Sequence, residues 1–229
     1  MSYLRFVCLL ASTLATAAVL MAVAQSPALQ RGISVQMAVT NNAATMPDAD
    51  NQNAWIVTVA ADGNLYFGID PVTRDGLAEV MIRTPRNREQ KLYIKADARA
   101  QFASVKAALG PVRASNFEDV VLLASQPASH ADGTMVPPKG IEVQLGNPGS
   151  GGAIVVRLSG PAQGSTLTVN DRRVTSTEFG STLKSIVHSH AQVVRVEAND
   201  AVPFGDVMHV IDEAHAAGAT VALPIYHSL

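Results

Sequence analysis

Three side chains with metal-ligand chemistry stand close together near the C-terminus: His209, Asp212 and Glu213. On a helix they would share one face, and an imidazole beside two carboxylates is a possible ligand set. No further ligand group is apparent at a matching spacing, and the HExxH pattern of zinc hydrolases is absent. The preferred interpretation is a solvated polar face, so the sequence predicts no metal site.

Two other patterns could carry chemistry but fit their surroundings poorly. The glycine-rich run 146–152 lacks the Gly-Lys-Ser/Thr ending of a phosphate loop and leads into a strand, whereas a phosphate loop opens a helix. A flexible hairpin is predicted there instead. His188 and His190 would face the same way only on a strand, but they lie at the end of a predicted helix. Neither pattern predicts a binding site.

Covalent catalysis has no candidate residue. The only cysteine, Cys8, lies in an apolar segment, and there is no G-x-S-x-G nucleophile elbow. Asp97 and the pair Asn199-Asp200 end predicted strands just before predicted helices, and helix capping is the preferred interpretation of their role. The sequence therefore predicts no catalytic residue, no metal and no cofactor, and we expect that the protein is not an enzyme.

A strand–helix–strand unit occurs twice, at residues 91–123 and 193–225. Each copy has a β-rich run, a polar corner, an apolar stripe at helical spacing and a second β-rich run. Gly218 can adopt the left-handed conformation that ends the second helix, and Asn116 stands at its counterpart. The clearest matches, all at an offset of 102 residues, are Ala96/Ala198, Phe102/Phe204 and Val105/Val207.

The flanking sequence extends each copy to strand, hairpin, helix, strand, helix, strand. Val72 is assigned to the first helix, and Gly110-Pro111 predicts a break or kink in the second. Thr175 and Glu178 form a capping box. Gly32–Met37 is a predicted strand echoed at Gly140–Leu145. The expected fold class is α+β, with a small mixed sheet in each copy and two helices on one face.

The predicted organisation has four parts. Residues 1–30 form an N-terminal anchor or signal segment, 31–126 a first domain, 127–139 a linker and 140–229 a second domain. The N-terminal part explains the high mean hydropathy of +0.17, because Phe6–Ala24 contains 19 residues and no charge. That length suits a transmembrane helix behind Arg5, while Ala22-Val23-Ala24 fits a signal cleavage site; both interpretations remain open. Either one places the rest of the chain outside the inner membrane.

Composition excludes further classes. The net charge is −2 and the pI near 6.3, and no basic patch stands out, which argues against nucleic-acid binding. A single cysteine excludes an intramolecular disulfide.

These features together resemble the ExbD/TolR family of biopolymer transport proteins. The residues that carry the resemblance are 62–66 (DGNLY) and 94–97 (IKAD) in the first copy, and 196–200 (VEAND), 204–207 (FGDV) and 217–218 (AG) in the second. The resemblance implies a single-pass protein of the bacterial inner membrane with a periplasmic domain, here present in two copies. It implies an ExbB/TolQ-like membrane partner and a TonB/TolA-like protein or peptidoglycan as further partners.

One departure from the family concerns the membrane segment. Family members that couple to protons carry an aspartate in their span, where a buried ionisable group is costly and kept for function. Phe6–Ala24 contains no acid, so an accessory subunit is one expectation. The alternative is a soluble periplasmic module that binds the cell wall or a protein after signal cleavage. We expect the two copies to pair as an intramolecular pseudo-dimer, with two independent domains or a homodimer as alternatives.

Overall fold

The computed structural model describes residues 33–51, 53–85, 90–125, 137–146, 152–160, 166–188 and 192–225. They belong to one compact unit, residues 31–229. The expected N-terminal anchor or signal segment, most of the predicted linker, most of the glycine-rich run and His190 lie outside the described residues. In the ranges given above, no helix is long and apolar enough to cross a membrane.

The first half of the described chain, residues 33–125, contains six strands and two α-helices. A short strand and a 3-10 helix come first: β1 (Ala44–Thr45) and η1 (Pro47–Asp50). The remaining elements are β2 (Trp55–Val59), β3 (Leu65–Phe67), β4 (Asp70–Val72), α2 (Arg74–Arg83), β5 (Leu92–Ala96), α3 (Phe102–Ala114) and β6 (Asp119–Ala124). Thr73 caps α2 by accepting a hydrogen bond from the Gly76 N–H, and Asn116 follows α3 with a φ of 64°.

The second half, residues 137–225, repeats this order after an additional strand, β7 (Lys139–Leu145). Its elements are β8 (Ile154–Ser159), β9 (Thr166–Val169), β10 (Arg172–Val174), α4 (Ser176–Ile186), β11 (Val193–Ala198), α5 (Phe204–Ala216) and β12 (Thr220–Leu223). The predicted capping box of Thr175 and Glu178 is confirmed at the start of α4. Gly218 has a φ of 82° after α5, as its place in the sequence predicted.

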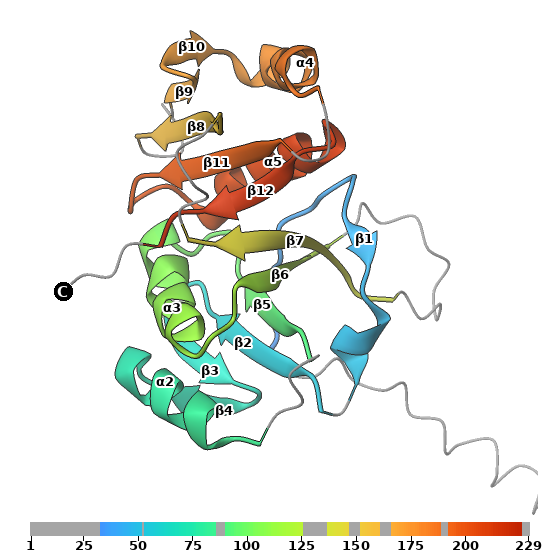
Figure 1. Cartoon of the computed structure of the whole chain (residues 1–229). Helices are drawn as coiled ribbons and strands as arrows, with labels where there is room; N and C mark the ends of the chain where they lie inside the picture. The colour runs from blue at the N-terminus through green and yellow to red at the C-terminus, as the bar shows by residue number, and fades with distance from the viewer. Residues whose placement is uncertain are drawn as a thin grey trace, which may run out of the picture. The chain divides into compact units, whose positions relative to one another are not determined.

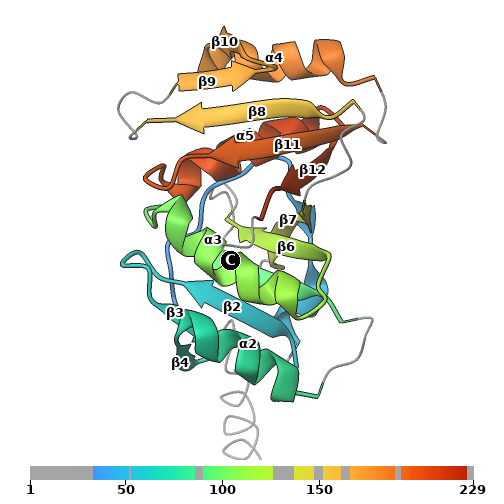
Figure 2. The same cartoon turned by 60° about the vertical axis from the view of Figure 1, so that its left-hand side comes forward.

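All the strands in the described residues form one mixed sheet. Its order is β10-β9-β8-β11-β12-β7-β6-β5-β2-β3-β4, with β1 also paired to β7. The expected separation into two small sheets is therefore wrong, and the reason is β7. This strand pairs antiparallel with β6 and parallel with β12, so it provides hydrogen-bonding partners for the inner edge of each half. Figures 1 and 2 show β7 between the strands of the two halves.

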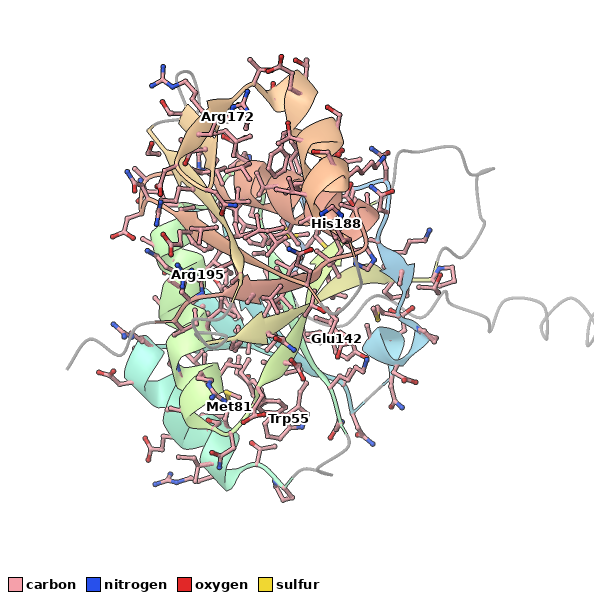
Figure 3. All side chains as sticks on the ribbon, turned by 45° about the horizontal axis from the view of Figure 1, so that its top comes forward. Trp55, Met81, Glu142, Arg172, His188 and Arg195 are labelled. Atoms are coloured by element: carbon pink, nitrogen blue, oxygen red, sulfur yellow. The ribbon has the colours of Figure 1, made fainter. Side chains whose placement is uncertain are left out.

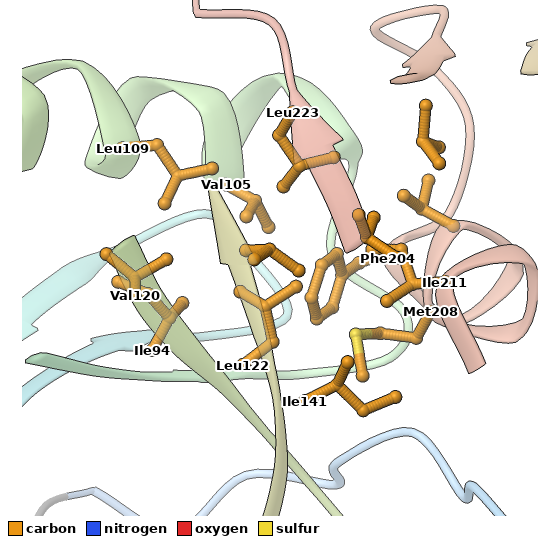
Figure 4. Packing of buried hydrophobic residues seen from close by; sticks show 14 of the residues in the cluster. Ile94, Val105, Leu109, Val120, Leu122, Ile141, Phe204, Met208, Ile211 and Leu223 are labelled. Atoms are coloured by element: carbon orange, nitrogen blue, oxygen red, sulfur yellow. The ribbon is translucent and has the colours of Figure 1, made fainter. Parts of the chain in front are cut away.

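The main hydrophobic core lies between the sheet and the four α-helices. Its buried residues come from both halves, and the α3 and α5 side chains meet over the central strands (Figure 4). Phe204, Met208 and Ile211 of α5 are fully buried there. Full burial of side chains of this size stabilises a fold by about 1.5–3 kcal/mol each.

A second, smaller core lies on the opposite face of the sheet, under the first half only. It consists of Ala49, Ile56, Tyr93, Val121 and Leu123, with Met37, Met46 and Ala54 packed against it. The segment that precedes β2 thus covers the first half of the sheet on this side. We call this side of the sheet the back face, and the side of the four helices the helical face.

Two local predictions are wrong, and a third is wrong in part. Val72 is the last residue of β4 and not part of a helix, because α2 begins after the Thr73 cap. Of the break or kink expected at Gly110-Pro111, the break does not occur: α3 continues through Pro111, which is buried in the core, so packing outweighs the lost backbone hydrogen bond. Residues 33–37 form no strand; Met37 makes a single bridge to Asp97.

Candidate functional site

Asp212 of α5 is a buried carboxylate that binds the N-terminal end of the described chain. It is 2% exposed. Its two oxygens accept hydrogen bonds from the backbone N–H groups of Asn41 and Asn42, each at 3.0 Å, and from the Asn42 side chain at 3.1 Å. The expected solvated face is therefore wrong for Asp212, although His209 is exposed. Among the described residues, no three His, Cys, Asp or Glu side chains lie together so that they could hold a metal ion.

Asp97, at the end of β5, is a second buried carboxylate, also 2% exposed. It accepts a hydrogen bond from the Gln36 backbone N–H at 3.0 Å. The guanidinium of Arg99 donates to both of its oxygens, at 2.9 Å each, and holds the pKa of this carboxyl well below its usual range. The predicted capping role is wrong, because α3 begins five residues later, after Gln101.

These two carboxylates hold the two ends of one segment, residues 36–42, which we call the strap. Backbone hydrogen bonds fix the strap between them. The Ala98 N–H donates to the Gln36 carbonyl at 2.8 Å, and Ser125 exchanges hydrogen bonds with Ala38 and Thr40 at 2.8 and 2.9 Å. The strap is therefore bound to β5 and β6 of the first half and to α5 of the second half.

The corners that lead into α3 and α5 contact each other directly. Phe102 donates its backbone N–H to the Val202 carbonyl at 2.8 Å, and Phe204 donates to the Ala100 carbonyl at 2.8 Å. The two donors, Phe102 and Phe204, are 102 positions apart, and so are the two acceptors, Ala100 and Val202. A second pair of hydrogen bonds is reciprocal in the same way. Ala103 donates its backbone N–H to the Asp200 carbonyl at 3.1 Å, and Gly205 donates to the Ala98 carbonyl at 2.8 Å.

The bridge at the centre of this contact pairs Gln101 with Pro203, which are themselves 102 positions apart. Two equivalent residues face each other only at a two-fold relation, so the corners meet as they do in an isologous interface. We call residues 98–103 and 200–205 the junction. Asp200 does not cap α5; its carboxylate forms an ion pair with Lys106 of α3 across the junction.

A buried amine lies close to the strap. Lys95 is 5% exposed and stands two residues before Asp97 on the back face. Burial lowers its pKa, and the nearby Asp50 acts in the opposite direction. Its cross-strand neighbour Thr58 is fully buried. The covering segment thus closes over polar as well as apolar side chains of the first half.

Sequence reasoning missed the strap and both of its carboxylate anchors. For Asp212 a signal existed, because it lies four residues after Met208 and so borders the apolar stripe of its helix. Asp97 was predicted as part of a polar corner, but nothing in the sequence indicates its partner 61 residues earlier. His188 is exposed, and its backbone N–H donates to the Gln192 side chain at 3.0 Å.

The strap and the junction connect the two halves through non-covalent contacts. Two buried carboxylates and reciprocal backbone bonds connect the N-terminal end of the described chain to both halves at once. Contacts of this kind can link a movement in one half to a movement in the other when both halves bind the same segment.

Comparison with known proteins gives one family. The protein-family model described as "ExbD: Biopolymer transport protein ExbD/TolR" matches residues 9–127, just over half of the chain. The match includes most of the N-terminal apolar run and all described elements of the first half. A search of curated proteins finds no match.

Proposed function

Because the chain belongs to the ExbD/TolR family of biopolymer transport proteins, we propose that it is a subunit of an inner-membrane energy-transducing complex. Its role there is biopolymer transport or envelope maintenance, without enzymatic activity and without a cofactor. The partner in the membrane is an ExbB/TolQ-like protein. A TonB/TolA-like protein or peptidoglycan is the contact on the periplasmic side. The family match is the observation that carries the proposal.

The proposed topology has one N-terminal span and a periplasmic remainder. The match begins at residue 9 and so includes most of the uncharged run that ends at Ala24. Arg5 on the short N-terminal side favours a cytoplasmic N-terminus. A reporter fused after Leu229 should be active in the periplasm; activity only in the cytoplasm would contradict this topology.

We propose an accessory role because the span lacks an acid. A proton relay needs a group that titrates near neutral pH, and this run has no carboxylate: beside the Cys8 thiol, its polar side chains are the hydroxyls of Ser12, Thr13 and Thr16. Expression of the chain in a cell without its own ExbD or TolR should not restore proton-driven function. Restoration by the unmodified chain would overturn the accessory role, and leave the family assignment standing.

We further propose that the second half is a second ExbD/TolR-like domain and that the two domains form an intramolecular pseudo-dimer. Three observations support this: the repeated order of elements, the shared offset of 102 residues and the reciprocal bonds at the junction. In this arrangement one chain would contribute both of the domains that a dimer takes from two chains. A homodimer of this chain is the alternative assembly.

The competing function is a periplasmic binding module released by signal cleavage. It is favoured by Ala22-Val23-Ala24, which suits a cleavage site before Gln25. Intact-mass measurement of the native protein separates the two. A full-length mass in the membrane fraction supports the subunit, and a mature start near Gln25 in the soluble fraction supports the module.

The central experiment is affinity purification of the tagged full chain from native membranes after mild crosslinking. An ExbB/TolQ-family protein should co-purify with it, and should be absent when the tag is placed on an unrelated single-span protein. Recovery of the intact chain from membranes without such a partner would overturn the proposed complex.

A further inference from the structure

The back face of the sheet differs between the two halves. In the first half, Ile56 and Tyr93 are neighbours on β2 and β5, and each is 2% exposed beneath the covering segment. The register places Val155 and Arg195 at the corresponding positions on β8 and β11. Both are only half-buried. The smaller back-face core is therefore replaced, in the second half, by an accessible surface with charged side chains.

Three arginines lie on this surface: Arg157, Arg173 and Arg195, which we call the arginine face. Arg173 of β10 and Arg157 of β8 both pair with Thr168 of β9, so they point to the same side two strands apart. Two strand spacings correspond to about 9–10 Å. Arg157 is in turn paired with Glu197, and Arg195 stands two residues before that glutamate on β11.

The arginines keep their charge and retain accessible donors. The Nε of Arg157 lies 2.8 Å from Glu197, and its other end pairs with Asp171 at the hairpin turn. The Nε of Arg195 lies 2.9 Å from the same glutamate. The Arg157 side chain is still 42% exposed and that of Arg195 24% exposed. Each guanidinium has five N–H donors, so these ion pairs do not use all of them.

Charge and shape indicate what this surface fits. Three arginines stand against Glu197 on the face and Asp171 at its rim, which leaves a positive excess on the pleated surface of the sheet. Guanidinium groups bind carboxylates in a two-pronged geometry, and arginine is enriched where carboxylates are recognised. Glu197 and Asp171 lie among the arginines and repel anions that come close to them. A continuous layer of anions cannot avoid these two carboxylates, whereas the separate carboxylates of an acidic peptide can bind the arginines alone.

We propose that the arginine face is a docking surface for an acidic segment of a partner polypeptide. The proposal goes beyond the family role, because the family match ends at residue 127 and this surface lies wholly after it. It also assigns different surfaces to the two halves: the first half covers its back face with its own chain, and the second half leaves that face to a partner. Figure 3 marks Arg195 among the side chains of the second half, with Arg172 on its outer hairpin.

The test uses the purified full chain in detergent and a fluorescent peptide of alternating glutamate and serine. Binding is followed by anisotropy at low and at physiological salt. The acidic peptide should bind, and binding should weaken as salt screens the charges. A matching lysine–serine peptide should not bind. Absence of acidic-peptide binding at low salt overturns the proposal.

Two variants locate the binding. R173Q, which changes an exposed side chain, and the triple variant R157Q/R173Q/R195Q should weaken acidic-peptide binding, the triple one by about tenfold or more. The matched control is R172Q, because Arg172 is the neighbouring residue of the same strand and pairs with the helical-face residue Val169. An equal loss with R172Q, or unchanged binding by R173Q, would overturn the assignment to this face. Binding to vesicles of anionic lipid that R173Q weakens, without peptide binding, would assign the face to a membrane surface instead.

Discussion

Asp97 and Asp212 lie in different halves of the chain, yet their carboxylates bind the two ends of the same seven-residue strap. Each is 2% exposed, and each accepts backbone N–H bonds at 3.0 Å. The strap is thus a mechanical connection between the halves in addition to β7 and the junction. Loss of the strap should therefore destabilise both halves of the chain.

The first prediction concerns the second-half anchor of the strap. Asp212→Asn replaces a buried acceptor-only group with an amide, which can no longer accept all the hydrogen bonds from the N–H groups of Asn41 and Asn42. We expect a loss of about 2–3 kcal/mol in unfolding free energy. The readout is urea unfolding followed by Trp55, the only tryptophan, which belongs to the first half.

The control for this prediction is His209→Ala, an exposed change on the same helix, with an expected effect within about 0.5 kcal/mol. If Trp55 reports the same unfolding midpoint in the Asp212 variant and the wild type, the two halves are not coupled through the strap.

The second prediction concerns pH. Arg99 and the Gln36 N–H lower the pKa of Asp97 in the folded protein below its value in the unfolded chain. The stabilisation from this carboxylate is therefore complete above the unfolded value of about 3.9 and is lost as pH falls through the folded pKa. Asp97→Asn should cost about 2–3 kcal/mol at pH 7, and the difference from wild type should shrink below about pH 4.

Denaturant titrations at neutral and acid pH measure that difference. Asp200→Asn serves as the matched control, because Asp200 occupies the equivalent corner but has a side chain 74% exposed, and surface ion pairs contribute about 0–1 kcal/mol. A pH-independent gap between wild type and the Asp97 variant would show that the charge of this carboxylate is not what holds the strap.

The third prediction tests the contact between the halves. Gln101 and Pro203 form the non-hydrogen-bonded pair between the two reciprocal bonds, where Cα atoms are about 4.5 Å apart. That separation suits a disulfide. In a chain with Cys8→Ser, the double variant Gln101→Cys/Pro203→Cys should form an intramolecular disulfide readily.

After air oxidation, mobility on a non-reducing gel and a mass lower by two hydrogen atoms identify the bond. A control pair with one cysteine moved to the exposed Ile82 should remain reduced under the same conditions. If the junction pair also stays reduced, or links two chains instead of one, the intramolecular pairing is wrong.

The fourth prediction compares two glycines. A Cβ on Gly140 of β7 would lie 2.5 Å from Val121 and 2.9 Å from the Leu122 carbonyl, so Gly140→Ala must push β6 and β7 apart. We expect a cost of about 1–3 kcal/mol. Gly110→Ala is the control: apart from the backbone of its own helix, the atom nearest to the new methyl is the Arg74 guanidinium, at 3.7 Å, and the change should stabilise the protein by about 0.5–1 kcal/mol. Equal effects in thermal unfolding would contradict the close approach at the shared strand.

The local elements were predictable because their signals are local. The Thr175–Glu178 capping box, the left-handed Asn116 and Gly218 and the apolar stripe of α5 depend on residues within a few positions of each other. The short outer strands β4 and β10 were missed, since three residues carry too little pattern to separate a strand from a turn.

The long-range features were not predictable from one sequence. The register that places β7 between β6 and β12 depends on strand edges that meet only in the folded chain. The same holds for Asp212, whose partners Asn41 and Asn42 lie about 170 residues earlier. Pattern can show that a carboxylate borders an apolar stripe, but not which backbone amides will meet it.

The central position of β7 has a consequence for synthesis of the chain. Strand β6 ends at Ala124 and its edge partner begins only at Lys139, so the first half leaves the ribosome with an unpaired inner edge. An open edge of this kind recruits other strands, including those of a second nascent chain. A product truncated after residue 127 would keep that edge permanently and should self-associate, whereas a product extended through Leu145 would cover it. Strand β7 therefore covers the open edge of β6, and so prevents self-association of the first half, before the rest of the second half has been synthesised.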